Sequence, residues 1–276
     1  AGVSSEGGGA VAYPVMTLVY EIEPAVARNF SLAIQSVGMT AAALYIRARR
    51  IPVETTYLGL VAFGSVPGLV GGTYLVAPHV PPAYAKMMFV SFFLSYGLAL
   101  FVINHVRDES AAEQLPTLTL GQQAELVVIG VVGGTLSAIF GNGVDICSFA
   151  FVTLKYRLSE KVATPTSVTL MAFNAVLGFA LHALVLGDMQ LEAYRFWWVS
   201  IPVVVFGAPL GAYVVSRVRR LHIATLLYTV IVVQFGTALW VIRPALPLLL
   251  FSAGVFGFGM ILFFQLPRWG PTQTSA

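Results

Sequence analysis

The sequence predicts an all-α polytopic membrane protein with two inverted repeats, broken or re-entrant helices and about nine or ten membrane segments. The first observation is composition: of 276 residues, 58% are apolar and 10% are charged, and the mean hydropathy is +0.84. A soluble domain carries about a quarter charged residues. The second is that apolar stretches of about 20 residues, the length that crosses a bilayer core of about 30 Å, recur along the whole chain. The third is a resemblance between the two halves.

The composition also excludes several classes of protein. So few charges exclude a cytosolic enzyme, a nucleic-acid binder and a disordered chain. The single cysteine, Cys147, excludes an internal disulfide and a cysteine-cage metal site. The strands of a membrane β-barrel alternate polar and apolar residues over about 10 positions, whereas these apolar stretches are longer and unbroken.

Each predicted segment is an apolar run closed by charged residues or by proline. In chain order the segments are 10–20, 24–46, 52–77, 83–104, 121–140, 143–156, 161–186, 192–216, 221–242 and 245–266. Two of them, 10–20 and 143–156, are about half the length that spans a bilayer, and both follow glycine clusters. One sizeable polar linker, 105–119, divides the chain into two parts of similar size.

The two parts match in register, which indicates duplication rather than chance matching between apolar segments. At an offset of 136 residues, Thr17, Tyr20, Val26, Ala27 and Ser31 meet Thr153, Tyr156, Val162, Ala163 and Ser167. We predict a first repeat at 1–104, a polar cytoplasmic linker at 105–120, a second repeat at 121–243, and an additional transmembrane helix with a tail at 244–276. The segment 121–140 has no counterpart in the first repeat, so we expect a further helix upstream of Ala1.

The basic residues indicate how the chain is oriented. If the repeats are inverted, the loops at 47–51 and 217–221, the turn at 155–161, Arg107 and Arg268 share one face, which holds 11 of the 15 basic residues. Cytoplasmic loops carry such an excess of Lys and Arg. We therefore predict a multi-pass protein of the plasma membrane with a cytoplasmic C-terminus. The segments 121–140 and 143–156 then form a hairpin that leaves from the cytoplasm and returns to it.

The glycine clusters predict where a solute binds. Gly7-Gly8-Gly9 and Gly141-Asn142-Gly143 each precede a short helix, whose unpaired N–H groups and positive dipole end suit an anion. Transporters with inverted repeats place solutes at such breaks, near the bilayer midplane. The alternative is that the glycines only allow close helix packing. The glycines of the segment 67–72 leave two alternatives open as well, a hinge or a tight crossing.

Polar side chains near the starts of two equivalent helices are candidates for binding the same solute. They are Asn29, Ser31 and Gln35 in the first repeat, and Thr166 and Ser167 in the second. The alternative is that the hydroxyl groups bond to carbonyls of their own helices.

Ionisable residues at membrane depth are expensive, and they are candidates for coupling or charge balance. Glu6, Arg28 and Asp145 are such residues. The alternatives are that Glu6 and Asp145 cap the short helices that follow them, and that Arg28 extends to the membrane surface. His182 lies near a helix end, and we expect it to be a satisfied interfacial residue.

The residues around the second glycine cluster resemble a known family. Gly133-Gly134, Ser137 and Gly141-Asn142-Gly143, followed by a short helix and Ala163-Thr164-Pro165-Thr166-Ser167, are similar to the TauE/SafE sulfite exporter family, with Ala27-Arg28-Asn29-Phe30-Ser31 as the first-half match. The resemblance covers nearly the whole chain. Asn142 and Asp145 interrupt what is often a longer glycine run in that family. The resemblance implies transport, usually outward, of small sulfur-containing anions such as sulfite or organosulfonates.

From the residues alone, the expected function is secondary transport of a small anion by alternating access around the glycine breaks. With the resemblance, the expectation becomes an exporter of sulfite or organosulfonates. The alternatives are a passive anion channel and an intramembrane enzyme acting on a lipid. The sequence contains no His-x-x-x-His pattern and no paired carboxylates one turn apart at membrane depth, so we expect no catalytic residue, cofactor or metal. The expected partners are the anion and the bilayer, with a homodimer as a candidate assembly and no nucleic acid.

Overall fold

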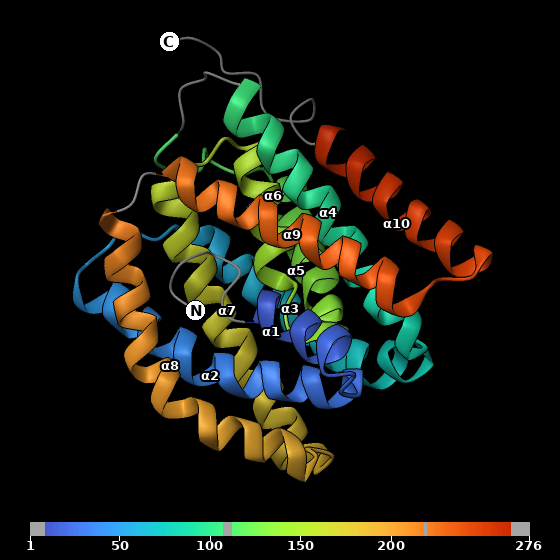
Figure 1. Ribbon diagram of the computed structural model, residues 1–276. Coiled ribbons are helices and arrows are strands. Elements are labelled where there is room, and N and C mark those ends of the chain that lie inside the picture. Colours follow the sequence, from blue (N-terminus) through green and yellow to red (C-terminus); the bar gives the residue numbers. More distant parts are fainter. Residues whose placement is uncertain (1–8, 107–111, 218–219, 266–276) are drawn as a thin grey trace.

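A computed structural model describes residues 9–106, 112–217 and 220–265. Within these ranges a helix forms at each predicted segment, and the helices pack into one bundle (Figure 1). They are α1 (Gly9–Pro14), α2 (Pro24–Ala48), α3 (Thr55–Gly71), α4 (Pro82–Val106), α5 (Leu120–Phe140), α6 (Val144–Lys155), α7 (Glu160–Ala180), α8 (Leu191–Arg217), α9 (Arg220–Ile242) and α10 (Leu246–Gln265). Short helical turns extend three of them, at Val15–Val19, Gly72–His79 and Leu181–Leu186. The described residues form no strand beyond one isolated bridge between Ala112 and Leu158, which confirms the all-helical class.

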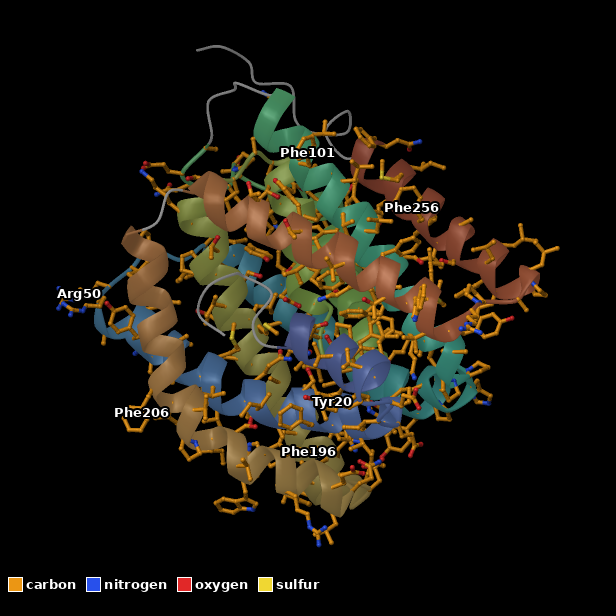
Figure 2. The ribbon with its side chains drawn as sticks, viewed as in Figure 1. Tyr20, Arg50, Phe101, Phe196, Phe206 and Phe256 are labelled. Carbon is orange, nitrogen blue, oxygen red and sulfur yellow. The ribbon has the colours of Figure 1, made fainter. Side chains whose placement is uncertain are left out.

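The helices have the length and the surface of a membrane protein. Five in the described ranges are long and apolar enough to cross a bilayer: Pro24–Ala48, Thr55–His79, Leu120–Phe140, Lys161–Leu186 and Leu246–Gln265. Large apolar side chains stand exposed around the bundle, among them Phe206 on α8 at 78% (Figure 2). So many large exposed apolar side chains suit lipid rather than water. The total of nine or ten membrane segments stays a prediction.

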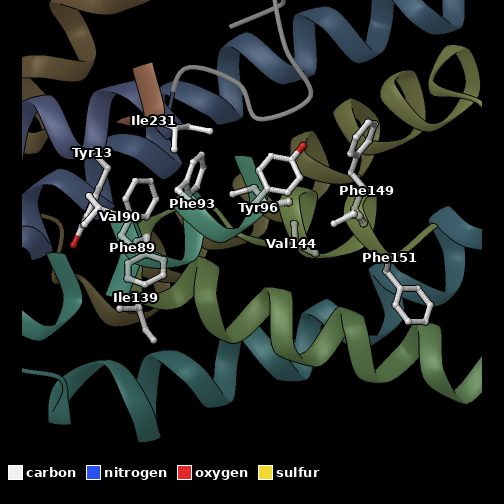
Figure 3. Packing of buried hydrophobic residues seen from close by; sticks show 14 of the residues in the cluster. Tyr13, Phe89, Val90, Phe93, Tyr96, Ile139, Val144, Phe149, Phe151 and Ile231 are labelled. Atoms are coloured by element: carbon white, nitrogen blue, oxygen red, sulfur yellow. The ribbon is translucent and has the colours of Figure 1, made fainter. Parts of the chain in front are cut away.

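The core of the bundle is aromatic where α1 and α4 meet the end of α5 (Figure 3). The ring of Tyr13 lies 5.1 Å from the ring of Phe89 and 5.8 Å from that of Phe140, and Phe89 stacks on Phe93 at 4.5 Å. Aromatic pairs favour such edge and offset contacts. Phe140 is the last residue of α5, so this cluster holds the helix end at which the break at residues 141–143 begins.

Glycines bring α3 and α5 into backbone contact. A Cβ on Gly64 would lie 2.0 Å from the carbonyl oxygen of Val127, and one on Gly68 would lie 2.2 Å from the carbonyl oxygen of Val131. Small residues spaced four apart let membrane helices approach this closely. Of the two alternatives for the segment 67–72, the structure therefore has the tight crossing.

The turns after the two short helices have the same backbone conformation at positions 136 residues apart. Glu21 has a φ of 53° and Arg157 a φ of 54°, a left-handed conformation that few residues other than glycine adopt. One turn earlier, Thr17 and Thr153 each donate a hydrogen bond to the carbonyl four residues before them, at 2.8 and 2.6 Å. The local structure therefore repeats where the sequence repeats.

The helices α2 and α7, which occupy equivalent places in the two halves, pack side by side and run antiparallel. At one end, Nδ2 of Asn29, in the second turn of α2, donates to Oε1 of Gln190, just beyond α7, at 2.9 Å. At the other end, the amide of Glu54, beyond α2, donates to Oγ1 of Thr166, in the second turn of α7, at 2.9 Å. Each helix also packs against the next long helix of the other half, α2 on α8 and α7 on α3.

The helices α5 and α6 form the predicted hairpin, with the break as its turn. The ammonium of Lys155, the last residue of α6, pairs with the carboxylate of Glu125 in the second turn of α5. The same ammonium lies 5.7 Å from the centre of the Tyr156 ring, within cation–π range. The α6 helix thus returns to the end at which α5 begins.

Three connecting segments meet at that end of the bundle. The amide of Ala112 donates to the carbonyl of Arg157 at 2.9 Å, and the amide of Leu115 donates to Oε2 of Glu54 at 3.4 Å. The loop after α2, the end of the polar linker and the turn after α6 therefore lie together. Residues 107–111 of the predicted linker lie outside the described residues.

Candidate substrate-binding site at the helix break

The break between α5 and α6 depends on two glycines in conformations that other residues rarely adopt. Gly141 has a φ of +83° and Gly143 a φ of +156°. A Cβ on Gly141 would lie 2.6 Å from the carbonyl oxygen of Arg28, and one on Gly143 would lie 2.7 Å from Cβ of Leu136. Glycine therefore lets α2 lie directly against the break and bring its polar side chains to it.

The first amides of α6 already have acceptors. Oδ1 of Asp145 accepts a hydrogen bond from the amide of Gly143, and Oγ of Ser137 accepts one from the amide of Val144, both at 3.1 Å. Asp145 and Ser137 are completely buried. A carboxylate is stabilised at the positive end of a helix, and here it occupies the position that would stabilise an anionic substrate. Of the two roles considered for Asp145, the structure contains the capping contact.

Asn142 is the polar residue of the break that the protein leaves unpaired. Its side chain is buried, at 2% exposure, and neither Nδ2 nor Oδ1 has a hydrogen-bond partner among the described residues. Buried amides are nearly always paired, because each unpaired buried polar group costs about 1–3 kcal/mol. An amide that a folded protein keeps in this state is a candidate for contact with a ligand.

Gln35, on α2, brings a second amide to the break. Its Nε2 donates to Oγ of Ser31 at 2.6 Å and to the carbonyl of Gly141 at 3.4 Å. Its Oε1 is buried and has no partner among the described residues. The amide of Gln35 thus joins α2 to the break through its nitrogen and leaves its oxygen available.

Two buried hydroxyl groups that the sequence analysis did not single out reach the site from other helices. The hydroxyl of Tyr57, on α3, donates to Oγ of Ser148, on α6, at 2.7 Å, and Ser148 donates to the carbonyl of Val144 at 2.5 Å. From α7, Oγ of Ser167 donates to the carbonyl of Asp145 at 3.4 Å. Polar groups from α2, α3, α6 and α7 therefore surround the start of α6.

The sequence as a whole matches one protein family. A family model described as "Sulfite exporter TauE/SafE" matches residues 1–237, which include the break and every helix around it. The chain belongs to the TauE/SafE family. Membership implies a multi-pass membrane transporter of the sulfite-exporter type rather than an enzyme. No curated protein and no solved structure is significantly similar to the chain.

In this TauE/SafE protein, the structure brings most of the predicted binding residues together at the break. Those that meet there are Ser31, Gln35, Gly141, Asn142, Gly143, Asp145 and Ser167. Thr166 is held elsewhere, since its hydroxyl donates to the carbonyl of Val162 at 2.7 Å and accepts from the amide of Glu54. Gly9 begins α1, whereas Glu6, Gly7 and Gly8 lie outside the described residues.

Arg28 and Asn29 belong to a second polar group near the start of α2. Nε of Arg28 donates to Oδ1 of Asn29 at 3.0 Å, and Nη1 donates to the carbonyl of Ala138, in the last turn of α5, at 3.4 Å. Arg28 is thus directed inward, toward the helix that leads into the break, and not toward the membrane surface.

His182, which we expected to be a satisfied interfacial residue, joins this second group. Its side chain is 1% exposed, because the residues after α7 fold back over it, and its Nδ1 lies 2.8 Å from Oδ1 of Asp188. Nε2 has no partner among the described residues.

A cavity of about 430 Å³ lies between α4, α5, α6 and α10, but its chemistry does not suit the anion of a TauE/SafE transporter. It is lined by apolar side chains, among them Phe92, Leu136, Phe151 and Phe258, with the thiol-bearing Cys147. An unpaired charge is costly in such surroundings. No three His, Cys, Asp or Glu side chains gather as metal ligands within the described ranges.

Proposed function

We propose that this TauE/SafE protein exports small sulfur-containing anions, such as sulfite or organosulfonates, by alternating access around the break at residues 141–143. The observation that carries the proposal is the buried amide of Asn142, whose two polar atoms have no partner among the described residues. Its Nδ2 supplies N–H donors for the oxygens of a sulfite or sulfonate group. Binding would thereby pair a polar group that has no partner among the described residues.

The charge of Asp145 gives the proposed site a coupling requirement. In the closed site its carboxylate accepts from the amide of Gly143, where a substrate anion would also be stabilised. Two anions that share a buried site repel, and one of them gains a proton or leaves. Substrate binding therefore follows displacement or protonation of Asp145. Arg28 supplies a balancing positive charge close to the end of α5, and Glu6 keeps its predicted coupling role.

The inverted arrangement of the two repeats is part of the proposal, and three features support it. The equivalent helices α2 and α7 run antiparallel. The turns at Glu21 and Arg157 share one backbone conformation. The loop after α2 and the turn after α6, both rich in basic residues, lie at the same end of the bundle. That end is the cytoplasmic one in this proposal, and a cytoplasmic C-terminus in the plasma membrane follows from it.

The closed state of the site favours a carrier over a passive channel. Ser31, Asp145 and Ser167 are completely buried. Hydrogen bonds join α2 to the chain around α7 at both ends, through Asn29 and Gln190 on one side and Glu54 and Thr166 on the other. A substrate reaches such a site only after the helices separate at one end, as alternating access requires. A homodimer stays a prediction.

Counterflow of sulfite in proteoliposomes tests the proposed function. Vesicles that contain the purified protein are loaded with unlabelled sulfite and diluted into a trace of labelled sulfite. If the protein is a carrier, vesicles loaded with sulfite are expected to take up label faster than vesicles without internal sulfite and to accumulate it transiently. The reason is that the binding site returns across the membrane with unlabelled sulfite bound. Vesicles without protein are the control.

Two results would contradict the proposal. If no sulfite flux depends on the protein, sulfite transport is excluded as its function. Flux that internal sulfite does not accelerate would indicate a passive channel instead of a carrier.

A further inference from the structure

A compact group of polar residues joins α2 to the segment that follows α7. Asn29 donates through Nδ2 to Oε1 of Gln190 at 2.9 Å and to the carbonyl of Asp188 at 3.5 Å, and it accepts from Nε of Arg28 at 3.0 Å. His182 completes the group through its contact with Asp188. Asn29 and His182 are each 1% exposed, whereas the carboxylate of Asp188 is about half-exposed, at 45%. The group is buried at its centre and reaches solvent through Asp188.

The hydrogen bonds of His182 indicate which of its nitrogens takes up a proton. Nδ1 faces Oδ1 of Asp188 at 2.8 Å, and a carboxylate oxygen accepts, so the neutral ring carries its hydrogen on Nδ1. Nε2 is then a bare acceptor, buried and without a partner among the described residues. Protonation turns Nε2 into a donor and the ring into a cation, which the carboxylate of Asp188 stabilises.

The charges around His182 make the binding of an anion near Arg28 depend on whether His182 is protonated. Arg28, on α2, and Asp188, beyond α7, are the charged groups whose fields act on His182. Their charges cancel when the ring is neutral. Glu23, which also acts on Arg28, is exposed, so its charge is largely screened by water and salt. An anion that approaches Arg28 therefore meets no net positive charge until His182 is protonated.

We propose that His182 and Arg28 form an outer site, at the end of the bundle opposite the cytoplasmic one, at which a sulfur oxyanion and a proton bind together. Nε2–H of the His182 imidazolium and the guanidinium of Arg28 are the donors, and the carboxylate of Asp188 holds the ring through Nδ1 and balances its charge. The proposal rests on the proposed anion transport and adds the proton as a co-substrate. Since Arg28 also contacts the carbonyl of Ala138, three residues before Gly141, this outer site lies directly beside the break.

The test compares His182→Gln with the wild type in the sulfite counterflow assay at about pH 5.5 and about pH 8.5, near the limits of the range in which histidine side chains change charge in proteins. Sulfite itself gains a proton in this range, so the measured quantity is the ratio of wild-type to variant flux, from which the chemistry of the substrate cancels. We expect a ratio near one at the higher pH and about tenfold at the lower pH, within the usual strength of coupling between two ligands. His79→Gln, an exposed histidine outside the group, is the matched control and should keep a ratio near one throughout.

A second variant and a folding control distinguish the possible results of this test. Asp188→Asn, at a half-exposed position that tolerates change, is expected to need a more acidic solution for the same flux, because the imidazolium loses its counter-ion. An unfolding temperature of His182→Gln in detergent equal to that of the wild type shows that the variant is folded. A ratio that stays constant with pH for both variants would overturn the proton site and leave sulfite transport intact. Absence of flux in the wild type would overturn both proposals.

Discussion

Asn142→Leu is expected to reduce sulfite counterflow at least about 100-fold while leaving thermal stability unchanged or slightly higher. Leucine has the same branched arrangement of side-chain heavy atoms as asparagine, and it removes two buried polar atoms that have no partner among the described residues. Removing unpaired polar groups does not weaken a fold, whereas a bound oxyanion loses donors that contribute about 1–3 kcal/mol per hydrogen bond to a charged group. A fall in counterflow without a fall in thermal stability distinguishes a binding role of Asn142 from a structural one.

The measurements are counterflow in proteoliposomes and the unfolding temperature in detergent. Asn174→Leu is the matched control, because Asn174 is also a buried amide, on α7, and makes no hydrogen bond to the break among the described residues. It should retain most of the flux. If Asn142→Leu instead lowered the unfolding temperature strongly and kept its flux, Asn142 would be a structural residue and the proposed site would lose its main support.

Gly64→Ala is expected to prevent α3 and α5 from packing, with a loss of at least about 3 kcal/mol in the free energy of unfolding. The added Cβ would lie 2.0 Å from a backbone oxygen of Val127. Backbone cannot rotate away as a side chain can, so one of the two helices must move. Because α5 leads into the break, transport should fall together with stability.

Gly71→Ala provides the control for this prediction. Gly71 ends the same helix, and a Cβ there meets nothing within 4 Å. Alanine is also the better helix former, by about 1 kcal/mol. The midpoint of unfolding in a detergent titration should therefore fall for Gly64→Ala and hold or rise for Gly71→Ala. Equal unfolding midpoints for the two variants would mean that α3 and α5 pack less closely at Gly64 than in the structure.

Much of the fold follows from the sequence because the helices of a membrane protein are bounded by simple chemistry. Charged residues and prolines close the apolar runs, and the observed helices begin and end within a few residues of those limits. Half of the site is visible in the same way, since Asn142 and Asp145 interrupt glycines and apolar residues at membrane depth. Such interruptions are rare and have a physical cost.

Tyr57 and Ser148 give no such signal along the chain. Tyr57 lies in an ordinary apolar run, and its partner Ser148 is 91 positions away, so only the packing of α3 against α6 joins them. His182 lies near a helix end, where interfacial residues are common. Its burial depends on the turn after α7, which folds Asp188 back onto the ring. Sequence spacing does not predict such contacts, because they depend on tertiary packing.

The two left-handed turns have a consequence for how this chain acquires its orientation. Glu21 and Arg157 occupy the same place in the same backbone conformation, yet one is acidic and the other basic. The shape of the turn therefore does not depend on the sign of its charge. Under the inverted topology that we propose, the two turns lie on opposite sides of the membrane, where basic residues are favoured on the cytoplasmic side alone. The charge at this position then helps to determine, during insertion, on which side of the membrane each turn lies. The same turn structure is used on both sides.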